Sequence, residues 1–256
     1  MAKSRFDLEG KVALVTGGNG GIGLGMAEAM AEAGADICIW GRNEEKNKAA
    51  EEKLKAYGHR VLALKCDVSD EKQVEACFSE AVRNLGKVDA CFANAGIGGF
   101  GTPFHETTIE EWRTVFGVNM EGVFFTFKAA IRHMIEQQIR GSLVVTSSLS
   151  SLSGAPRSIP YACTKGAVLS MVRSLAVGYA RYGIRANSII PGWIETDMTS
   201  RSFSDEKFEN AVLRRIPQRR WGVPADFGPA AVYFASDASE YHSGDSFTID
   251  GAYFRF

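Results

Sequence analysis

The chain has 256 residues, of which 45% are hydrophobic and 23% charged, and its formal net charge is −1. This composition is that of a globular protein able to bury a sizeable core, and it excludes a low-complexity chain. No half of the chain is strongly basic, so we expect no nucleic-acid partner. The chain contains 27 glycines among 256 residues, a larger share than the usual value of about 7%.

Targeting signals and metal-binding spacings are missing from the sequence. The segment Met1–Lys11 is polar and charged, and no apolar run reaches the roughly 18 residues that a membrane helix needs. We therefore expect a cytoplasmic protein without membrane contact. The 5 cysteines show no C-x-x-C spacing, and the 4 histidines form no H-x-H or H-x-x-x-H pair. These patterns predict buried free thiols and no metal site.

Short apolar runs rich in β-branched residues alternate with longer runs of helical period. The predicted strands are Val12–Thr16, Ile37–Trp40, Val61–Cys66, Val88–Ala93, Leu143–Thr146, Arg185–Ile190 and Phe247–Ile249. The predicted helices are Ile22–Ala33, Glu44–Tyr57, Glu71–Leu85, Ile109–Glu136, Tyr161–Tyr182 and Ala225–Phe234. This alternation predicts an α/β, doubly wound Rossmann-type fold of about seven parallel strands with helices on both faces.

No linker interrupts this alternation, so residues 1–256 are expected to form a single domain. The stretch at about residues 195–223 breaks the rhythm with mixed charge, scattered aromatic residues and no clear strand, and a helical pattern lies around Ser204–Arg215. We expect it to form a mobile flap that closes over a substrate. A plain surface excursion is the alternative.

A glycine-rich segment, Thr16–Gly23, separates the first predicted strand from the first predicted helix. It matches both G-x-G-x-x-G, starting at Gly18, and T-G-x-x-x-G-x-G, starting at Thr16. Glycines let the backbone approach a pyrophosphate, which the N–H groups of a helix start attract. The segment therefore predicts a dinucleotide cradle, although a merely tight turn would use the same residues.

The end of the second predicted strand indicates which dinucleotide is bound. NAD-preferring sites place an acidic residue there, where it accepts hydrogen bonds from the ribose hydroxyls. Gly41 takes the place of that acid, and the guanidinium of Arg42 fits a 2′-phosphate and can stack on adenine. We therefore predict NADP(H) as the cofactor. The alternative is a solvated Arg42 paired with Glu44 or Glu45.

Candidate catalytic residues occur around the fifth predicted strand. The helix after it opens with Tyr161, and Lys165 lies one turn later on the same face, while Ser148 follows the strand itself. A phenol titrates near pKa ~10, so it needs a nearby cation to act as an acid or base at neutral pH. Lys165 can supply that cation, although Y-x-x-x-K alone is common on structural helices.

Together these residues resemble the short-chain dehydrogenase/reductase family over nearly the whole chain, from about Leu8 onward. The motifs that carry the resemblance are T-G-x-x-x-G-I-G at Thr16–Gly23, Asp67-Val68, Asn94-Ala95-Gly96, Asn119, Ser148, Tyr161, Lys165 and Pro191-Gly192. Two departures stand out. Ala93 replaces an Asn that many members carry, and the glycine loop lacks the basic residue that some NADP-preferring members have before Gly21.

The resemblance implies an NADP(H)-dependent carbonyl reductase or secondary-alcohol dehydrogenase. Tyr161 would be the acid and base, and Ser148 would hold the substrate oxygen. Lys165 would bind the nicotinamide ribose and lower the pKa of Tyr161, and Asn119 would kink its helix and hold a water in a proton relay. The residues implied or predicted to bind the cofactor are Gly17, Asn19, Gly20, Gly21, Ile22, Gly23, Arg42, Asn43, Asp67, Val68, Asn94, Ala95, Gly96, Tyr161, Lys165, Pro191, Gly192, Ile194 and Thr196.

Substrate contacts are expected from Ser148, Trp193 and Phe203. The segments Ile97–Phe104 and Leu149–Pro160 are rich in apolar residues, which favours a neutral or weakly polar ketone over a sugar phosphate.

Members of the family usually form tetramers, and exposed C-terminal aromatic residues need a partner, so we expect a homotetramer. Two other functions stay open: a dinucleotide-sensing regulator without turnover, and an epimerase or dehydratase that uses bound NADP.

Overall fold

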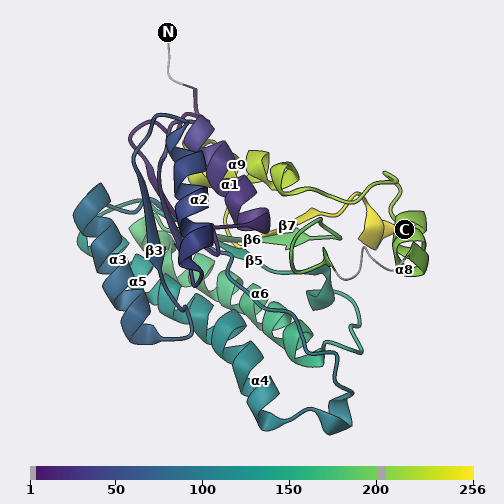
Figure 1. The fold of residues 1–256 in the computed structure, drawn as a ribbon. Coiled ribbons are helices and arrows are strands. Elements are labelled where there is room, and N and C mark those ends of the chain that lie inside the picture. Colours follow the sequence, from purple (N-terminus) through teal and green to yellow (C-terminus); the bar gives the residue numbers. More distant parts are fainter. Residues whose placement is uncertain (1–3, 201–205) are drawn as a thin grey trace.

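Parallel strands form the centre of the structure, a computed structural model that describes residues 4–200 and 206–256. Within these residues, seven strands form one sheet in the order β3-β2-β1-β4-β5-β6-β7 (Figure 1). Their bounds are β1 Val12–Thr16, β2 Asp36–Gly41, β3 Val61–Lys65, β4 Ala90–Ala93, β5 Ser142–Thr146, β6 Arg185–Pro191 and β7 Ser246–Ile249. Strand order reverses between β1 and β4, which confirms the doubly wound α/β fold and places a ligand crevice at their carboxyl ends.

Helices cover both faces of this sheet (Figure 1). Their bounds are α1 Gly21–Glu32, α2 Glu44–Lys55, α3 Glu71–Leu85, α4 Ile109–Phe116, α5 Gly122–Glu136, α6 Ile159–Tyr179, α8 Glu206–Arg215 and α9 Gly228–Ala235. Core contacts place α1, α2 and α9 on one face, and α3, α5 and α6 on the other. No helix in the described ranges combines the length and the hydropathy needed to cross a membrane.

Several predicted helix boundaries were wrong, and α9 for instance begins at Gly228 and not at Ala225. The helix expected over Ile109–Glu136 is divided by a π-helical turn, Gly117–Glu121, because extra residues are accommodated there. The helix expected to start at Tyr161 begins at Ile159, since Pro160 is tolerated in the first turn, where no N–H is needed.

Side-chain caps explain where α2 and α3 begin. The side chain of Asn43 accepts a hydrogen bond from the backbone N–H of Lys46 at 2.9 Å. Asp70 likewise accepts from the backbone N–H of Gln73 at 3.2 Å. Both caps satisfy N–H groups that a helix start leaves without partners. At the other end of α3, Gly86 has a φ of 90°, which glycine adopts without strain.

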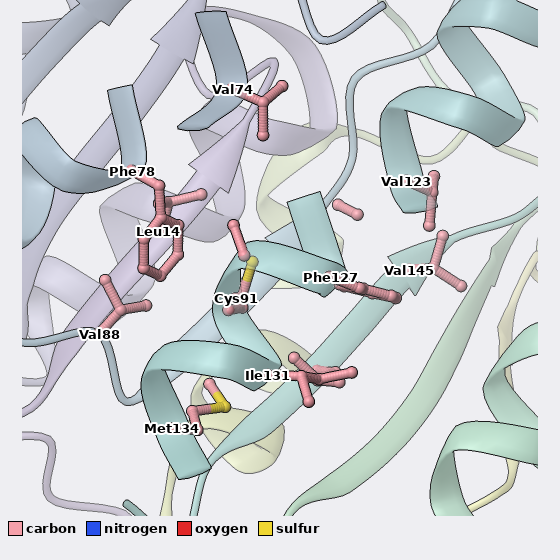
Figure 2. Close-up of a cluster of buried hydrophobic side chains, with 14 of the residues drawn as sticks. Leu14, Val74, Phe78, Val88, Cys91, Val123, Phe127, Ile131, Met134 and Val145 are labelled. Atoms are coloured by element: carbon pink, nitrogen blue, oxygen red, sulfur yellow. The ribbon is translucent and has the colours of Figure 1, made fainter. Parts of the chain in front are cut away.

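The alternation of side chains along each strand divides the core into two clusters. Leu14 of β1 packs on the α3 and α5 side with Phe78, Cys91 and Phe127 (Figure 2). The next residue, Val15, faces the opposite cluster beside α1 and α9. A shift of one residue in strand pairing would exchange these faces, so the buried pattern fixes the register that aligns the strand ends.

The stretch at 195–223 contains α8, which lies near the C terminus in Figure 1. The guanidinium of Arg215 on this helix lies 4.3 Å from the ring centroid of Tyr253. Tyr253 is partly buried, whereas Phe254 and Phe256 are 37% and 73% exposed. One C-terminal aromatic residue thus docks within the chain, and the other two remain on the surface.

Candidate active site

Asn94 joins the carboxyl ends of β1, β4 and β5. Its Nδ2 donates to the carbonyl oxygen of Thr16 at 3.1 Å, and its Oδ1 accepts from the hydroxyl of Thr146 at 3.0 Å. The hydroxyl oxygen of Thr16 in turn accepts from the backbone N–H groups of Asn94 and Ala95, at 3.0 and 2.9 Å. The Asn94 side chain therefore holds three strand ends together at the switch point, where ligands of this fold bind.

The glycine loop before α1 is shaped by positive φ angles and by lack of space. The φ angles are 64° at Gly17 and 51° at Gly21, in the region that favours glycine. A Cβ on Gly23 would lie 2.5 Å from Nδ2 of Asn94, whereas Gly20 has open space around it. The T-G-x-x-x-G-x-G spacing therefore describes the loop better than G-x-G-x-x-G. Such a loop lets a pyrophosphate approach the backbone closely.

A side chain in place of Gly41, at the end of β2, would meet the ends of two asparagine side chains. A Cβ there would lie 2.5 Å from Cγ of Asn19 and 2.5 Å from Oδ1 of Asn47. Asn19 donates to Asn47 at 2.6 Å, and Asn47 donates to the carbonyl oxygens of Gly41 and Leu64, at 2.9 and 3.1 Å. This network occupies the position at which NAD-preferring sites place their carboxylate.

Arg42 follows Gly41 with a largely exposed side chain. Its guanidinium lies 4.0 Å from Oδ2 of Asp67, one of the residues that the family resemblance implies for cofactor binding. The alternative pairing with Glu44 is wrong, because Glu44 contacts Lys65 at 2.8 Å. An exposed guanidinium held only at 4.0 Å is free to bind a phosphate.

Ser148, Tyr161 and Lys165 lie together where β5 ends and α6 begins. The Ser148 side chain interacts with the Tyr161 hydroxyl and acts to lower its pKa, and Nζ of Lys165 lies 5.5 Å from the ring centroid of Tyr161. The Lys165 ammonium donates to the carbonyl oxygen of Thr146 at 2.7 Å and is only 5% exposed. Tyr161 and Ser148 are partly buried. The structure thus brings together the three residues that the sequence singled out.

Asn119 lies in the π-helical turn between α4 and α5 and is fully buried. Its Nδ2 donates to the carbonyl oxygen of Ile97, and its Oδ1 accepts from the backbone N–H of Ile97, both at 2.9 Å. A Cβ on Gly96 would lie 3.3 Å from Oδ1 of Asn119 and 3.4 Å from Nζ of Lys165. The predicted distortion of this helix is confirmed, and the turn clamps the segment after β4 beside Lys165. The water in the relay stays a prediction.

The segment after β6 lies against the glycine loop. Gly192 donates its N–H to the carbonyl oxygen of Ile249 at 2.9 Å, and a Cβ on Gly192 would lie 2.7 Å from Asp250. A Cβ on Gly21 would lie 3.2 Å from Cγ2 of Thr196. Thr196 therefore lies in contact with the glycine loop.

Trp193 packs against side chains of the stretch at 195–223. Its ring lies 5.2 Å from Phe208 and 5.5 Å from Trp221, with perpendicular planes in both pairs. It also lines a cavity of about 380 Å³ together with Arg220 and Asp250, and none of Ser148, Tyr161 and Lys165 lines that cavity. The substrate role of Trp193 stays a prediction, and Phe203 lies outside the described residues.

Several other predicted cofactor residues have structural tasks. Asn43 caps α2, as described above, and Val68 is buried against Gly122, on which a Cβ would lie 2.8 Å from Val68. Ile194 is 4% exposed, and Ile22 packs at the edge of the α1 core. The cofactor assignments of these residues rest on their backbone position and stay predictions.

Comparison with known proteins agrees with this geometry. Residues 17–253 match the family model described as Enoyl-(Acyl carrier protein) reductase. The chain is 38% identical to a 2-dehydro-3-deoxy-D-gluconate 5-dehydrogenase from Dickeya dadantii, with 99% of each chain covered. The chain belongs to the short-chain dehydrogenase/reductase family.

Two further members of this family are similar along almost the whole chain. A sorbose reductase from Candida albicans is 35% identical, covering 97% of this chain and 88% of that one. The crystal structure of a gluconate 5-dehydrogenase from Burkholderia cenocepacia, in complex with NADP and tartrate, superposes with a TM-score of 0.93 at 35% identity and covers 98% of both chains. As a member of this family, the chain is an oxidoreductase that interconverts CH–OH and carbonyl groups.

Burial moves the pKa values of the two central groups in opposite directions. It lowers the pKa of Lys165 to about 8 and raises the pKa of Tyr161 above its ordinary value, against the opposing effect of the Ser148 hydrogen bond. The expectation that Lys165 lowers the pKa of Tyr161 stays a prediction, and the ammonium itself donates a hydrogen bond to the Thr146 carbonyl. Tyr161 is protonated at neutral pH and ready to donate a proton.

Sequence reasoning missed contributors that act through the backbone or through distant contacts. The carbonyl of Thr146 positions Lys165, the hydroxyl of Thr16 orders the segment after β4, and Asn47 closes the β2 end. Asn47 could have been noticed in the sequence, since it is an asparagine within a helix of mostly charged residues. Its burial is known only from the structure. No local pattern marks the carbonyl of Thr146.

Proposed function

We propose that this enzyme catalyses the reversible, NADP(H)-dependent reduction of a ketone on a small polyhydroxylated substrate, a sugar or sugar acid. The observation that carries the proposal is the meeting of Ser148, Tyr161 and Lys165 beside a glycine loop that excludes side chains. A protonated phenol, a second hydroxyl and a buried cation are the groups that carbonyl reduction needs.

In the reductive direction, the proton comes from the chain's own residues. Ser148 donates a hydrogen bond to the carbonyl oxygen, and Tyr161 transfers its proton to that oxygen as negative charge develops. Bound NADPH supplies the hydride that the carbonyl carbon accepts. Lys165 stabilises the resulting phenolate by its charge, and a proton from solvent then restores Tyr161. In the oxidative direction Tyr161 acts as the base, which its raised pKa makes more difficult.

NADP(H) is the cofactor that the crevice fits. The glycine loop accepts a pyrophosphate, and Gly41 offers no carboxylate to bind the ribose hydroxyls. Arg42 supplies a guanidinium for the 2′-phosphate. The NADP in the related gluconate 5-dehydrogenase structure supports this assignment. An Arg42→Asp variant that still preferred NADPH to NADH would overturn it.

The substrate class comes from the relatives, whose names refer to gluconate derivatives and sorbose. A neutral ketose agrees with the weakly polar ketone expected from the sequence, whereas a sugar acid would need a cation at the mouth of the site. Arg157, in the loop before α6, is exposed and available for that contact.

The first experiment follows the loss of NADPH fluorescence, with NADH in parallel, over ketoses, keto-aldonates, aryl ketones and a 3-oxoacyl thioester. We expect turnover with NADPH and a sugar-type ketone. Turnover only with the thioester would reject the substrate class. Tight NADPH binding without turnover on any ketone would favour the sensor alternative, and product formation without net change in NADPH would favour the epimerase.

We also propose a cytoplasmic homotetramer in which residues 195–223 form a flap over the substrate. Large apolar side chains remain exposed on the two long helices, namely Phe124 on α5 at 48% and Val177 on α6 at 83%, which supports burial against a second subunit. Light scattering at micromolar concentration tests the assembly, and a stable monomer would refute it. Cell fractionation tests the location.

A further inference from the structure

An ion pair connects the start of α2 to the segment that follows β6. Nζ of Lys46 lies 2.5 Å from Oδ2 of Asp197. Lys46 is in the first turn of α2 and donates its backbone N–H to the cap Asn43, the residue next to Arg42. The proposed function gives this ion pair no task.

The turn that carries Asp197 is well ordered by its own hydrogen bonds. The hydroxyl of Thr199 donates to the carbonyl oxygen of Ile194 at 2.5 Å and accepts from the backbone N–H of Thr196 at 3.1 Å. Thr196 in turn approaches Gly21 of the glycine loop. The Lys46–Asp197 pair therefore joins the start of α2, close in sequence to Arg42, to the turn that contacts the glycine loop.

Three cations, one after β2, one in the first turn of α2 and one at the end of β3, each have a carboxylate partner. The pairs are Arg42–Asp67 at 4.0 Å, Lys46–Asp197 at 2.5 Å and Lys65–Glu44 at 2.8 Å, and all six side chains are solvent-accessible. Exposed pairs of this kind are weak and exchange partners readily. The hydrogen bond from Lys46 lowers the pKa of Asp197, so the carboxylate is ionised at neutral pH and competes with any other anion for the ammonium.

We propose that Lys46 is a second cation for the 2′-phosphate of NADP(H), and that Asp197 competes with this phosphate for it. The inference rests on the proposed cofactor. A phosphate carries about −1.5 to −2 charges and three acceptor oxygens, so it displaces a single exposed carboxylate from an ammonium. Lys46 then supplies from α2 the positive charge that the glycine loop lacks before Gly21. NAD(H) has no such phosphate and leaves the Lys46–Asp197 pair intact.

The test measures dissociation constants of NADPH and NADH by the change in nicotinamide fluorescence, without substrate. We expect Lys46→Gln to raise the Kd of NADPH about fivefold or more and to leave the Kd of NADH within about twofold. Asp197→Asn should lower the Kd of NADPH about threefold, again without effect on NADH. In the double variant the gain from Asp197→Asn should vanish, because the carboxylate acts by holding Lys46.

Lys55→Gln is the matched control, because Lys55 is an exposed lysine in the last turn of the same helix, paired with Glu51 at 2.7 Å. Equal losses for NADPH and NADH in Lys46→Gln would overturn the inference in favour of a structural pair. If Asp197→Asn still lowered the Kd of NADPH in the absence of Lys46, Asp197 would act by repelling the phosphate directly. That result would also overturn the inference. Wild-type enzyme that binds NADH as tightly as NADPH would instead refute the proposed cofactor preference itself.

Discussion

Replacing Lys165 by methionine should inactivate the enzyme and yet stabilise its fold near neutral pH. Burial lowers the pKa of Lys165 from its ordinary 10.5 to about 8. At about 1.36 kcal/mol per pH unit, this fall means that charged Lys165 destabilises the folded state by about 3 kcal/mol. Methionine removes that cost but leaves the Thr146 carbonyl without its donor, which costs about 1–2 kcal/mol. A net gain of about 1–2 kcal/mol follows.

The pH dependence separates these two contributions. Because the pKa of Lys165 is lower in the folded than in the unfolded protein, the folded protein loses this proton first as pH rises. The destabilisation is fully present below about pH 8 and is relieved between about pH 8 and 10.5, at about 1.4 kcal/mol per pH unit. The loss of the Thr146 hydrogen-bond donor does not vary in this way.

Urea unfolding of wild type and Lys165→Met, at one protein concentration and from about pH 7 to about pH 10, measures the difference in unfolding free energy. We expect the advantage of the variant to shrink, and to change sign, as pH rises. Lys55→Met, which removes an exposed lysine, should differ from wild type by a nearly constant amount. If the difference in unfolding free energy between Lys165→Met and wild type were equally independent of pH, the conclusion that burial of charged Lys165 destabilises the fold would be refuted.

The remaining predictions concern proton transfer, the glycine cradle and the helix distortion. Tyr161→Phe should lose nearly all ketone reduction while the Kd of NADPH changes little, because only the proton donor is removed; ordinary turnover would refute its role. Ser148→Ala should reduce kcat less, by about 10²–10³, as one hydrogen bond to the developing alkoxide is lost. Gly23→Ala should weaken NADPH binding severely, whereas Gly20→Ala should not, since only Gly23 lacks space for a Cβ. Asn119→Ala should destabilise the fold by about 1–3 kcal/mol in denaturant titration, because the partly buried N–H and C=O of Ile97 lose their partners.

Much of the fold could be predicted because its signals are local. Continuous apolar runs such as Leu143–Thr146 indicated the buried parallel strands, and the structure extends this run only to Ser142. The glycine excess and the Tyr161–Lys165 spacing indicated the crevice and its chemistry. The break in the helix at Asn119 followed from the family resemblance, whereas its π-helical form did not.

The contacts across the crevice could not be predicted, because they join residues far apart in the sequence. Arg42 meets Asp67 instead of the nearby glutamates, and Lys46 meets Asp197. Their pairing depends on how β2, β3 and β6 align, and no local period records that alignment. For the same reason the direction of the Lys165 ammonium toward Thr146, and the burial that raises the pKa of Tyr161, needed the folded structure.

The sequence by itself determined the α/β architecture, the glycine cradle and the identity of the Ser148, Tyr161 and Lys165 group. Apolar periodicity and residue chemistry are properties of short segments, so they can be read along the chain. Only the tertiary structure decided which charges are buried, which are paired and which backbone carbonyl receives Lys165. Burial and pairing depend on surfaces that several strands and helices build together, and they set the ionisation on which the proposed reaction depends.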